Sequence, residues 1–197
     1  EKRLIAMLSV MLLDHLAGRP DVDRARLGVT GGSGGGTQSF MLAAMDERVR
    51  VAFPAVMVGT EMQGGCVCEN APHLRVGTSN IGICALVAPR ALGMTGADDW
   101  TLHIEEHGLP ELKQVWSLYG RADAVEAKCF PQFGHNYNAH GRARMYAFMA
   151  RHLQLESSTS ERSFEAIPPA RLSVYADSLR PEERDASEVF TWWREQA

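Results

Sequence analysis

The sequence predicts an α/β fold in which helices cover both faces of a mostly parallel β-sheet. Short apolar segments alternate with amphipathic ones up to about residue 155, which is the pattern of repeated strand–helix–strand units. A glycine-rich turn with a single serine joins the first expected strand to the next helix. Two later strands end in an aspartate pair and in a glycine–histidine turn. Because parallel strands bring their carboxyl ends to one edge of the sheet, these polar residues are expected to meet there.

The first half of the chain is expected to hold two helix–strand pairs. Apolar residues recur at helical spacing over residues 2–17, so this segment predicts a helix that packs on the core. Residues 27–30 form a short apolar strand, and residues 37–45 form the helix that follows the glycine-rich turn. Residues 48–55 alternate and then become apolar throughout, which is typical of a second, buried strand.

The second half continues the alternation after a long loop. Residues 56–80 show no sustained period and contain several glycines, and loops of this length in compact domains are usually functional. The later expected elements alternate in type: a short helix over 80–87, a strand over 91–95, a helix over 102–119 that Gly-Leu-Pro interrupts once, a strand over 125–130 and a helix over 142–152.

The sequence changes character near residue 155. We therefore expect a catalytic domain over 1–155 and an extension over 156–197. Residues 156–162 are polar and rich in serine, which is typical of a linker. Residues 172–175 alternate like a short strand, and residues 181–195 have a helical pattern. The apolar face of that last helix would consist of Val189, Phe190, Trp192 and Trp193.

The composition argues against several classes of protein. A net charge of −4 without a basic stripe argues against nucleic-acid binding. The apolar segment 4–13 is too short to cross a bilayer, so we expect no membrane partner. The cysteines are too irregularly spaced for a zinc site, so no metal is expected, and their disulfide state is left open; they are Cys66, Cys68, Cys84 and Cys129.

The glycine-rich turn over 31–35 fits the G-x-S-x-G nucleophile elbow. Ser33 would take a strained backbone angle there, and the residues two before and two after it would have to be small because they crowd each other. The backbone N–H of Gly34 would face a developing oxyanion at the start of the following helix. A flexible loop and a phosphate-binding turn are the alternatives, although a P-loop would need a lysine before the threonine.

Three strand ends carry the residues of a catalytic triad in the order Ser, Asp, His. Ser33 would be the nucleophile, and His135 the base that takes its proton and later protonates the leaving alcohol. The carboxylate would hold the imidazole tautomer. Asp99 is the favoured acid, with Asp98 as the alternative that would otherwise cap the following helix.

Other residues near these strand ends have open roles. Glu69 and Glu61 lie in the loop after the second strand and are rival acids, because hydrolases can place the acid there. Trp100 and Tyr137 adjoin the predicted acid and base, so they would either line a substrate pocket or serve in ordinary packing.

Several segments of the chain resemble one branch of a known family. The segments TGGSGGGTQSFMLAAMDERV, MQGGCVCENAP, APRALGMTGADDWT and FGHNYN are similar to the acetylxylan-esterase-like branch of bacterial α/β-hydrolases, over roughly residues 20–155. The resemblance implies Ser33 as nucleophile, Asp99 as acid and His135 as base. It also implies acetyl groups on a sugar as substrate, no cofactor, and export from the bacterial cell. In this branch a glycine commonly precedes the Asp-Trp pair, and here Asp98 takes its place.

The α/β-hydrolase sheet is larger than the four strands found in this sequence. The strands that would precede the first one are missing, together with the loop that donates a second oxyanion N–H. The chain is therefore expected to be a fragment, to receive its missing half from another molecule, or to complete its sheet as a homo-oligomer. In each case the edge before the first strand should be covered, because an open edge is unfavourable.

The leading hypothesis is a serine esterase that removes acetyl or similar short acyl groups from carbohydrate. Its partner would be a small ester or an acylated carbohydrate. The alternatives are another α/β-hydrolase, such as a glucuronoyl esterase, a dienelactone-type hydrolase or a peptidase, or a catalytically incomplete hydrolase domain used for assembly.

Overall fold

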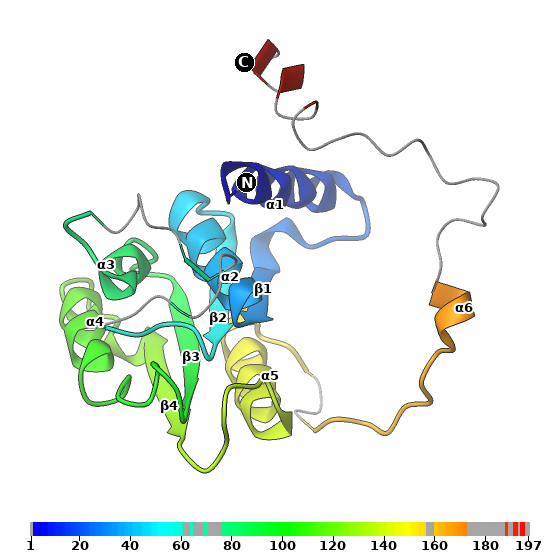
Figure 1. Cartoon of the computed structure of the whole chain (residues 1–197). Coiled ribbons are helices and arrows are strands. Elements are labelled where there is room, and N and C mark those ends of the chain that lie inside the picture. Colours follow the sequence, from blue (N-terminus) through cyan, green and yellow to red (C-terminus); the bar gives the residue numbers. More distant parts are fainter. Residues whose placement is uncertain are drawn as a thin grey trace. The chain divides into compact units, whose positions relative to one another are not determined.

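The chain separates into two units, residues 1–161 and residues 162–197 (Figure 1). The computed structural model of the protein describes residues 2–60, 64, 69–70, 76–156, 160–172, 188, 191–192 and 194–195, without the side chains of residues 2–7. The expected catalytic domain over 1–155 lies within the first unit.

A four-stranded, wholly parallel sheet forms the centre of the first unit. Its strands are β1 (Leu27–Gly32), β2 (Val49–Ala55), β3 (Ala91–Ala97) and β4 (Val125–Phe130), in the spatial order β1-β2-β3-β4. All seven residues of β3 are buried, as expected of a parallel strand that is covered on both faces. The predicted parallel α/β fold is confirmed. In the described residues no strand pairs with the outer edge of β1, so its expected cover stays a prediction.

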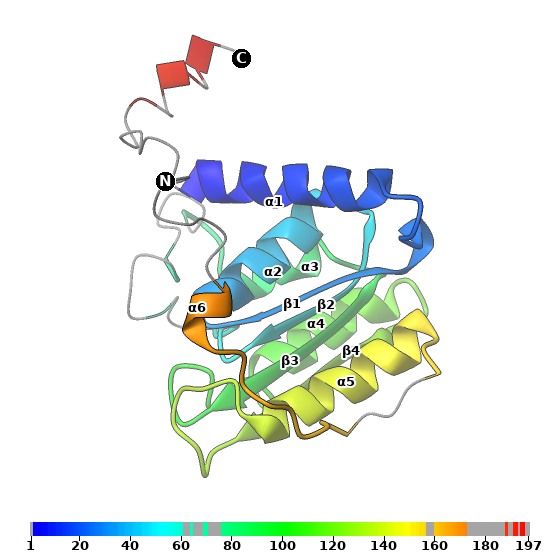
Figure 2. The same cartoon turned by 90° about the vertical axis from the view of Figure 1, so that its right-hand side faces the viewer.

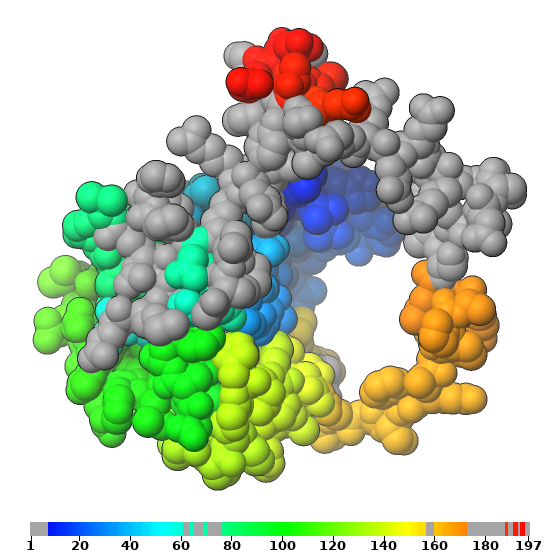
Figure 3. Space-filling model, viewed as in Figure 1, coloured from blue at the N-terminus to red at the C-terminus, as the bar shows by residue number. Residues whose placement is uncertain are grey.

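Two apolar layers cover the two faces of this sheet. On one face lie α2 (Gly34–Met45), α3 (Asn80–Ala85) and α4 (Gly108–Ser117), and α1 (Lys2–Gly18) packs on α2. On the other face lies α5 (Ala139–Leu153), as Figure 2 shows. Its Phe148, Met149 and Leu153 side chains pack with residues of the strands. The segments from α4 to α5 form one continuous surface in the space-filling view (Figure 3). None of the described helices is both long and apolar enough to cross a membrane.

The expected helix over 102–119 is shorter in the structure. Residues 102–107 form turns, and α4 begins at Gly108. Gly108 is buried, and a Cβ there would lie 2.5 Å from the Ile81 side chain, so glycine is kept for close packing. Pro110 falls in the first turn of the helix, where its missing N–H leaves no helical hydrogen bond unmade. The Gly-Leu-Pro sequence therefore starts a helix here and does not interrupt one.

The second unit contains little described structure. Its helix α6 (Pro169–Leu172) includes Leu172, so the strand expected over 172–175 is wrong at that residue, and residues 173–175 lie outside the described part. Residues 188, 191–192 and 194–195 are helical, as predicted. Trp192 is 55% exposed, while Val189, Phe190 and Trp193 lie outside the described residues.

The cysteines are described in part. Cys84 and Cys129 are free and buried, and burial raises the pKa of both thiols. Cys66 and Cys68 lie outside the described residues, so their disulfide state stays open.

Candidate active site

Ser33 lies in a strained turn between β1 and α2. Its backbone angles are φ 56° and ψ −122°, in a region that side-chain-bearing residues seldom occupy. The Ser33 N–H donates to the Ala55 carbonyl at 3.0 Å, which ties the turn to the end of β2. Val56, the next residue beyond β2, also has a positive φ of 47°. Such strain is typical of functional sites, where the surrounding structure holds it in place.

The glycines around Ser33 differ in whether their surroundings leave room for a side chain. A Cβ on Gly31 would lie 2.5 Å from the backbone of Gly35, so only glycine fits there. A Cβ on Gly35 would have no described atom within 4 Å, so the crowding that was expected at both positions is found at Gly31 alone. A Cβ on Gly36 would lie 2.8 Å from Met57, which explains how α2 approaches β2 closely.

Gly34 occupies the first turn of α2 directly after Ser33 and is buried. The N–H groups of a first helical turn have no acceptor inside the helix, and they lie at the positive end of its dipole. The predicted oxyanion donor is therefore in a position from which it can bind negative charge that develops next to the Ser33 oxygen.

Asp99 and His135 meet beyond the ends of β3 and β4. The Asp99 Oδ2 atom lies 2.7 Å from His135 Nδ1, and the Asp99 side chain is only 6% exposed. The other oxygen, Oδ1, accepts hydrogen bonds from the backbone N–H of Thr101, at 2.7 Å, and from its hydroxyl. Asp98 is exposed, and its N–H donates to the Phe133 carbonyl. Of the two adjacent aspartates, Asp99 is thus the one that contacts the histidine.

Glu69 lies between Ser33 and His135. The Ser33 hydroxyl donates a short hydrogen bond to Glu69 Oε1, and this oxygen lies 3.5 Å from His135 Nε2. The Glu69 side chain is 5% exposed and packs against Gly64, where a Cβ would lie 2.5 Å from it. The described residues show no direct hydrogen bond between Ser33 and His135. Glu61, the other rival acid, lies outside the described residues.

Trp100 and Tyr137 each pack against a residue at the end of a strand or beyond it. The Trp100 ring lies on the His135 ring with centroids 4.7 Å apart, and its indole N–H donates to the Met57 carbonyl at 3.2 Å. The Tyr137 ring packs over Gly32. The Tyr137 hydroxyl lies 2.8 Å from Thr30 Oγ1, and burial raises the pKa of Tyr137. Their predicted role in binding substrate stays a prediction.

Thr101 is a site residue that the sequence reasoning missed. Its hydroxyl accepts from the Ala97 N–H at 3.0 Å and donates to Asp99, so it fixes the carboxylate to the end of β3. The signal was the Asp-x-Thr spacing, because an aspartate commonly accepts from the backbone two residues ahead.

The fold of this chain is similar to that of several solved esterase structures. No protein-family model and no curated protein sequence matches the chain. A solved structure of methylesterase BT1017 is 31% identical with a TM-score of 0.74, over 80% of this chain and 37% of that one. A glucuronoyl esterase of carbohydrate esterase family 15 from Caldicellulosiruptor kristjansonii is 20% identical with a TM-score of 0.59, over 84% of this chain and 54% of that one.

A third neighbour is a glucuronoyl esterase mutant from Sporotrichum thermophile in complex with methyl 4-O-methyl-beta-D-glucopyranuronate. It is 15% identical with a TM-score of 0.61, over 85% of this chain and 56% of that one. The chain thus covers less than two thirds of each of these proteins. The fold is of the α/β-hydrolase type. These neighbours are carbohydrate esterases, and they do not specifically support the acetylxylan-esterase branch.

Proposed function

We propose that this chain carries the catalytic residues of a serine esterase that hydrolyses carbohydrate esters. Ser33 is the nucleophile, His135 the general base and Asp99 the carboxylate that orients His135. The observation that carries the proposal is the placement of a strained Ser33 at the same sheet edge as a His135 whose Nδ1 is held at 2.7 Å by Asp99. A carboxylate on Nδ1 keeps the proton there and leaves the Nε2 lone pair free to act as a base.

The reaction follows from these positions. His135 Nε2 takes the Ser33 proton while Ser33 Oγ forms a bond to the ester carbonyl carbon, and the Gly34 N–H stabilises the oxyanion. The bond to the alcohol oxygen then breaks, and the imidazolium gives its proton to that oxygen. A water molecule repeats the sequence on the acyl-enzyme, with His135 as base, and releases the acid and free Ser33.

Glu69 has a different role in this proposal. Its oxygen faces Nε2 and not Nδ1, so it cannot hold the tautomer that leaves Nε2 free. In the resting site Glu69 accepts a hydrogen bond from the Ser33 hydroxyl. Before attack, this hydroxyl must donate to His135 Nε2 instead. Once the imidazolium forms, Asp99 and Glu69 flank its two nitrogens, and both negative charges stabilise it.

The ester that we propose first is that of a sugar carboxylate, in which an alcohol leaves and a uronate remains bound to Ser33. Its support is the similarity to a methylesterase and to glucuronoyl esterases. An acetyl ester of a sugar is the second candidate, and its support is the resemblance of the sequence segments around Ser33, Asp99 and His135.

Hydrolysis of p-nitrophenyl acetate by the parent chain and by Ser33→Ala tests the esterase proposal. We expect the variant to lose about 1,000-fold or more in kcat. The matched control is Ser117→Ala, which removes an exposed hydroxyl from the end of α4 and should retain full turnover. No turnover by a folded parent chain would contradict the proposal and would favour the interpretation as an incomplete hydrolase domain. Comparing methyl glucuronate with an acetylated xylo-oligosaccharide then separates the two ester classes.

A further inference from the structure

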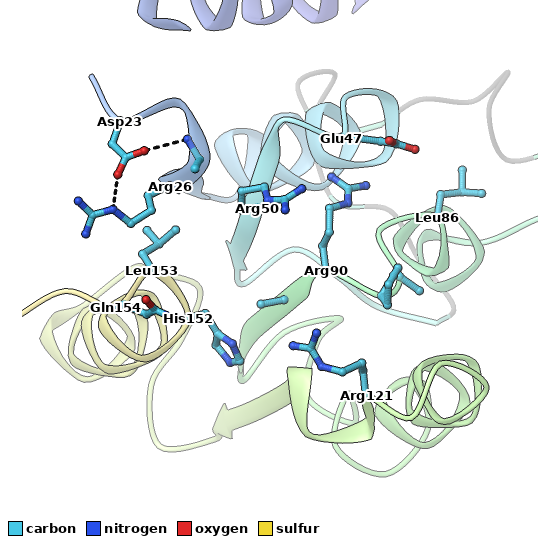
Figure 4. Close-up of a pocket in the computed structure, with 14 residues that line it drawn as sticks. Asp23, Arg26, Glu47, Arg50, Leu86, Arg90, Arg121, His152, Leu153 and Gln154 are labelled. Atoms are coloured by element: carbon cyan, nitrogen blue, oxygen red, sulfur yellow. Dashed lines mark hydrogen bonds and ion pairs between the residues drawn. The ribbon is translucent and has the colours of Figure 1, made fainter. Parts of the chain in front are cut away.

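A cavity of about 810 Å3 lies at the amino ends of the strands. Figure 4 shows the residues that line it. Its lining comes from segments that precede or begin the four strands, from the turn after α3 and from the last turn of α5. Because the strands are parallel, these amino ends meet at one edge, and the catalytic residues meet at the other. The cavity is therefore separate from the candidate active site.

Positive charge dominates the lining of this cavity. Four arginines contribute to it, against two carboxylates from Asp23 and Glu47; the arginines are Arg26, Arg50, Arg90 and Arg121. Arg26 is neutralised, since its guanidinium lies 2.6 Å from the Asp23 carboxylate. Arg121 has only a loose partner, Asp123, at 4.0 Å. The other two, Arg50 and Arg90, have no carboxylate within ion-pair distance among the described residues.

Those two arginines, Arg50 and Arg90, lie close to each other. The Arg90 guanidinium donates to three neutral backbone carbonyls at the end of α2 and the start of β2, at 2.6 to 3.0 Å. These bonds fix Arg90 without neutralising its charge. Burial lowers the pKa of Arg90; the Glu47 carboxylate opposes this shift, and the charge of Arg50 adds to it. The side chain of Arg50 makes no hydrogen bond or ion pair with the described part of the chain.

The arrangement of Arg50 and Arg90 favours the binding of an anion. Two like charges at close range repel each other, and an oxyanion between them would replace repulsion with attraction. Guanidinium groups bind carboxylates and phosphates with paired hydrogen bonds. Arg121 and His152 face the same space in Figure 4. Pro89 and Leu86 add an apolar wall.

We infer that this cavity binds a small organic anion through a carboxylate or phosphate group held by Arg50 and Arg90. The cavity has the volume of a site for a molecule of sugar size, so a lone inorganic ion would leave most of it to water. A uronate and a sugar phosphate share the required chemistry. The inference does not depend on the esterase proposal.

Isothermal titration calorimetry with glucuronate, glucose 1-phosphate and inorganic phosphate, at constant ionic strength, tests this inference. We expect the parent chain to bind at least one of the two sugar anions more tightly than inorganic phosphate. Arg50→Gln should weaken that binding about tenfold or more, because it removes one charged partner. The sugar anion that binds more tightly identifies the oxyanion as carboxylate or phosphate.

The matched control is Arg24→Gln, which removes the same charge from the short helix η1 (Arg24–Arg26) but does not line the cavity. It should bind like the parent. Arg121→Gln serves as a second cavity variant if Arg50→Gln does not fold, as judged by circular dichroism. Absence of binding for all probes would overturn the inference. So would equal weakening by Arg24→Gln, or inorganic phosphate binding as tightly as both sugar anions.

Discussion

Ser33 donates its hydroxyl hydrogen bond to Glu69, whose accepting oxygen lies 3.5 Å from His135 Nε2. The imidazole of His135 therefore has a carboxylate at each nitrogen, with Asp99 at 2.7 Å from Nδ1. Only the carboxylate on Nδ1 can fix the tautomer in which Nε2 accepts a proton. The two acids are thus chemically distinct, and substitution can separate them.

Asp99→Asn and Glu69→Gln should have very different effects on ester hydrolysis. We expect Asp99→Asn to lower kcat by about 1,000-fold or more, because an amide at this position favours the wrong histidine tautomer. Glu69→Gln should lower kcat by about tenfold or less, since a glutamine can still accept from Ser33. Steady-state kinetics with p-nitrophenyl acetate gives both values. A larger fall in kcat for Glu69→Gln than for Asp99→Asn would make Glu69 the orienting acid. A fall for Asp98→Asn as large as that for Asp99→Asn would support Asp98 as the acid.

Trp100 should act as a positioning residue for His135. Its ring lies 4.7 Å from the imidazole, and its N–H anchors it to the Met57 carbonyl. Trp100→Phe keeps an aromatic ring against His135 and should retain most of kcat, whereas Trp100→Ala should lower kcat by roughly tenfold with little change in KM for a small nitrophenyl ester. If KM rises in both variants while kcat is unchanged, Trp100 contacts the substrate and does not hold the histidine.

The sequence predicted those features that depend on strand periodicity and on strand ends. The parallel arrangement of β1 to β4 follows from alternating helices and strands, and it brings the strand ends that carry Ser33, Asp99 and His135 together. The sequence favoured Asp99 over Asp98 because Asp98 could cap the following helix, and the resemblance supported that choice, although two adjacent aspartates have nearly the same local pattern. The structure separates them through Thr101, whose backbone and hydroxyl both bind the Asp99 carboxylate.

The features that escaped prediction depend on contacts between distant segments. Glu69 was one of two acids in a loop without periodicity, and its place beside Ser33 depends on a contact between residues 36 positions apart in the sequence. The sequence around Gly108 indicated a break within a helix. The packing of Gly108 against Ile81 gave no local signal, because Ile81 lies far away in the sequence. Arg90 likewise gave no local signal that it would bind the carbonyls at the end of α2.

The two outer glycines of the elbow should differ in their tolerance of a methyl group. In Gly31→Ala the new Cβ would meet the Gly35 backbone at 2.5 Å, so the turn must shift and Ser33 must lose its position. We expect a clear fall in the thermal midpoint and at least a 100-fold loss of kcat. Gly35→Ala meets no described atom within 4 Å and should be folded and active, with a stability gain of up to about 1 kcal/mol for alanine in a helix. Equal damage in both variants, by calorimetry and kinetics, would contradict this reading.

His152 should make the fold less stable in mildly acidic solution. Its ring packs 4.4 Å from the Phe148 ring, and burial, followed by the positive charge of Arg151, lowers the pKa of His152 in the folded chain. Glu126 opposes this shift, while Arg121 adds to it. Between the lowered pKa and the unfolded value of about 6.5, the unfolded chain binds more protons, so the free energy of unfolding falls as the pH drops through this window.

Urea unfolding of the parent and of His152→Gln, at pH about 7.5 and about 5, measures the effect of His152. The variant should lose less stability than the parent between the two pH values, because glutamine does not titrate. His15→Gln removes an exposed imidazole from α1 and should lose as much stability as the parent. If His152→Gln loses as much stability as the parent, the acid sensitivity of the fold lies in other groups and the role given to His152 is wrong.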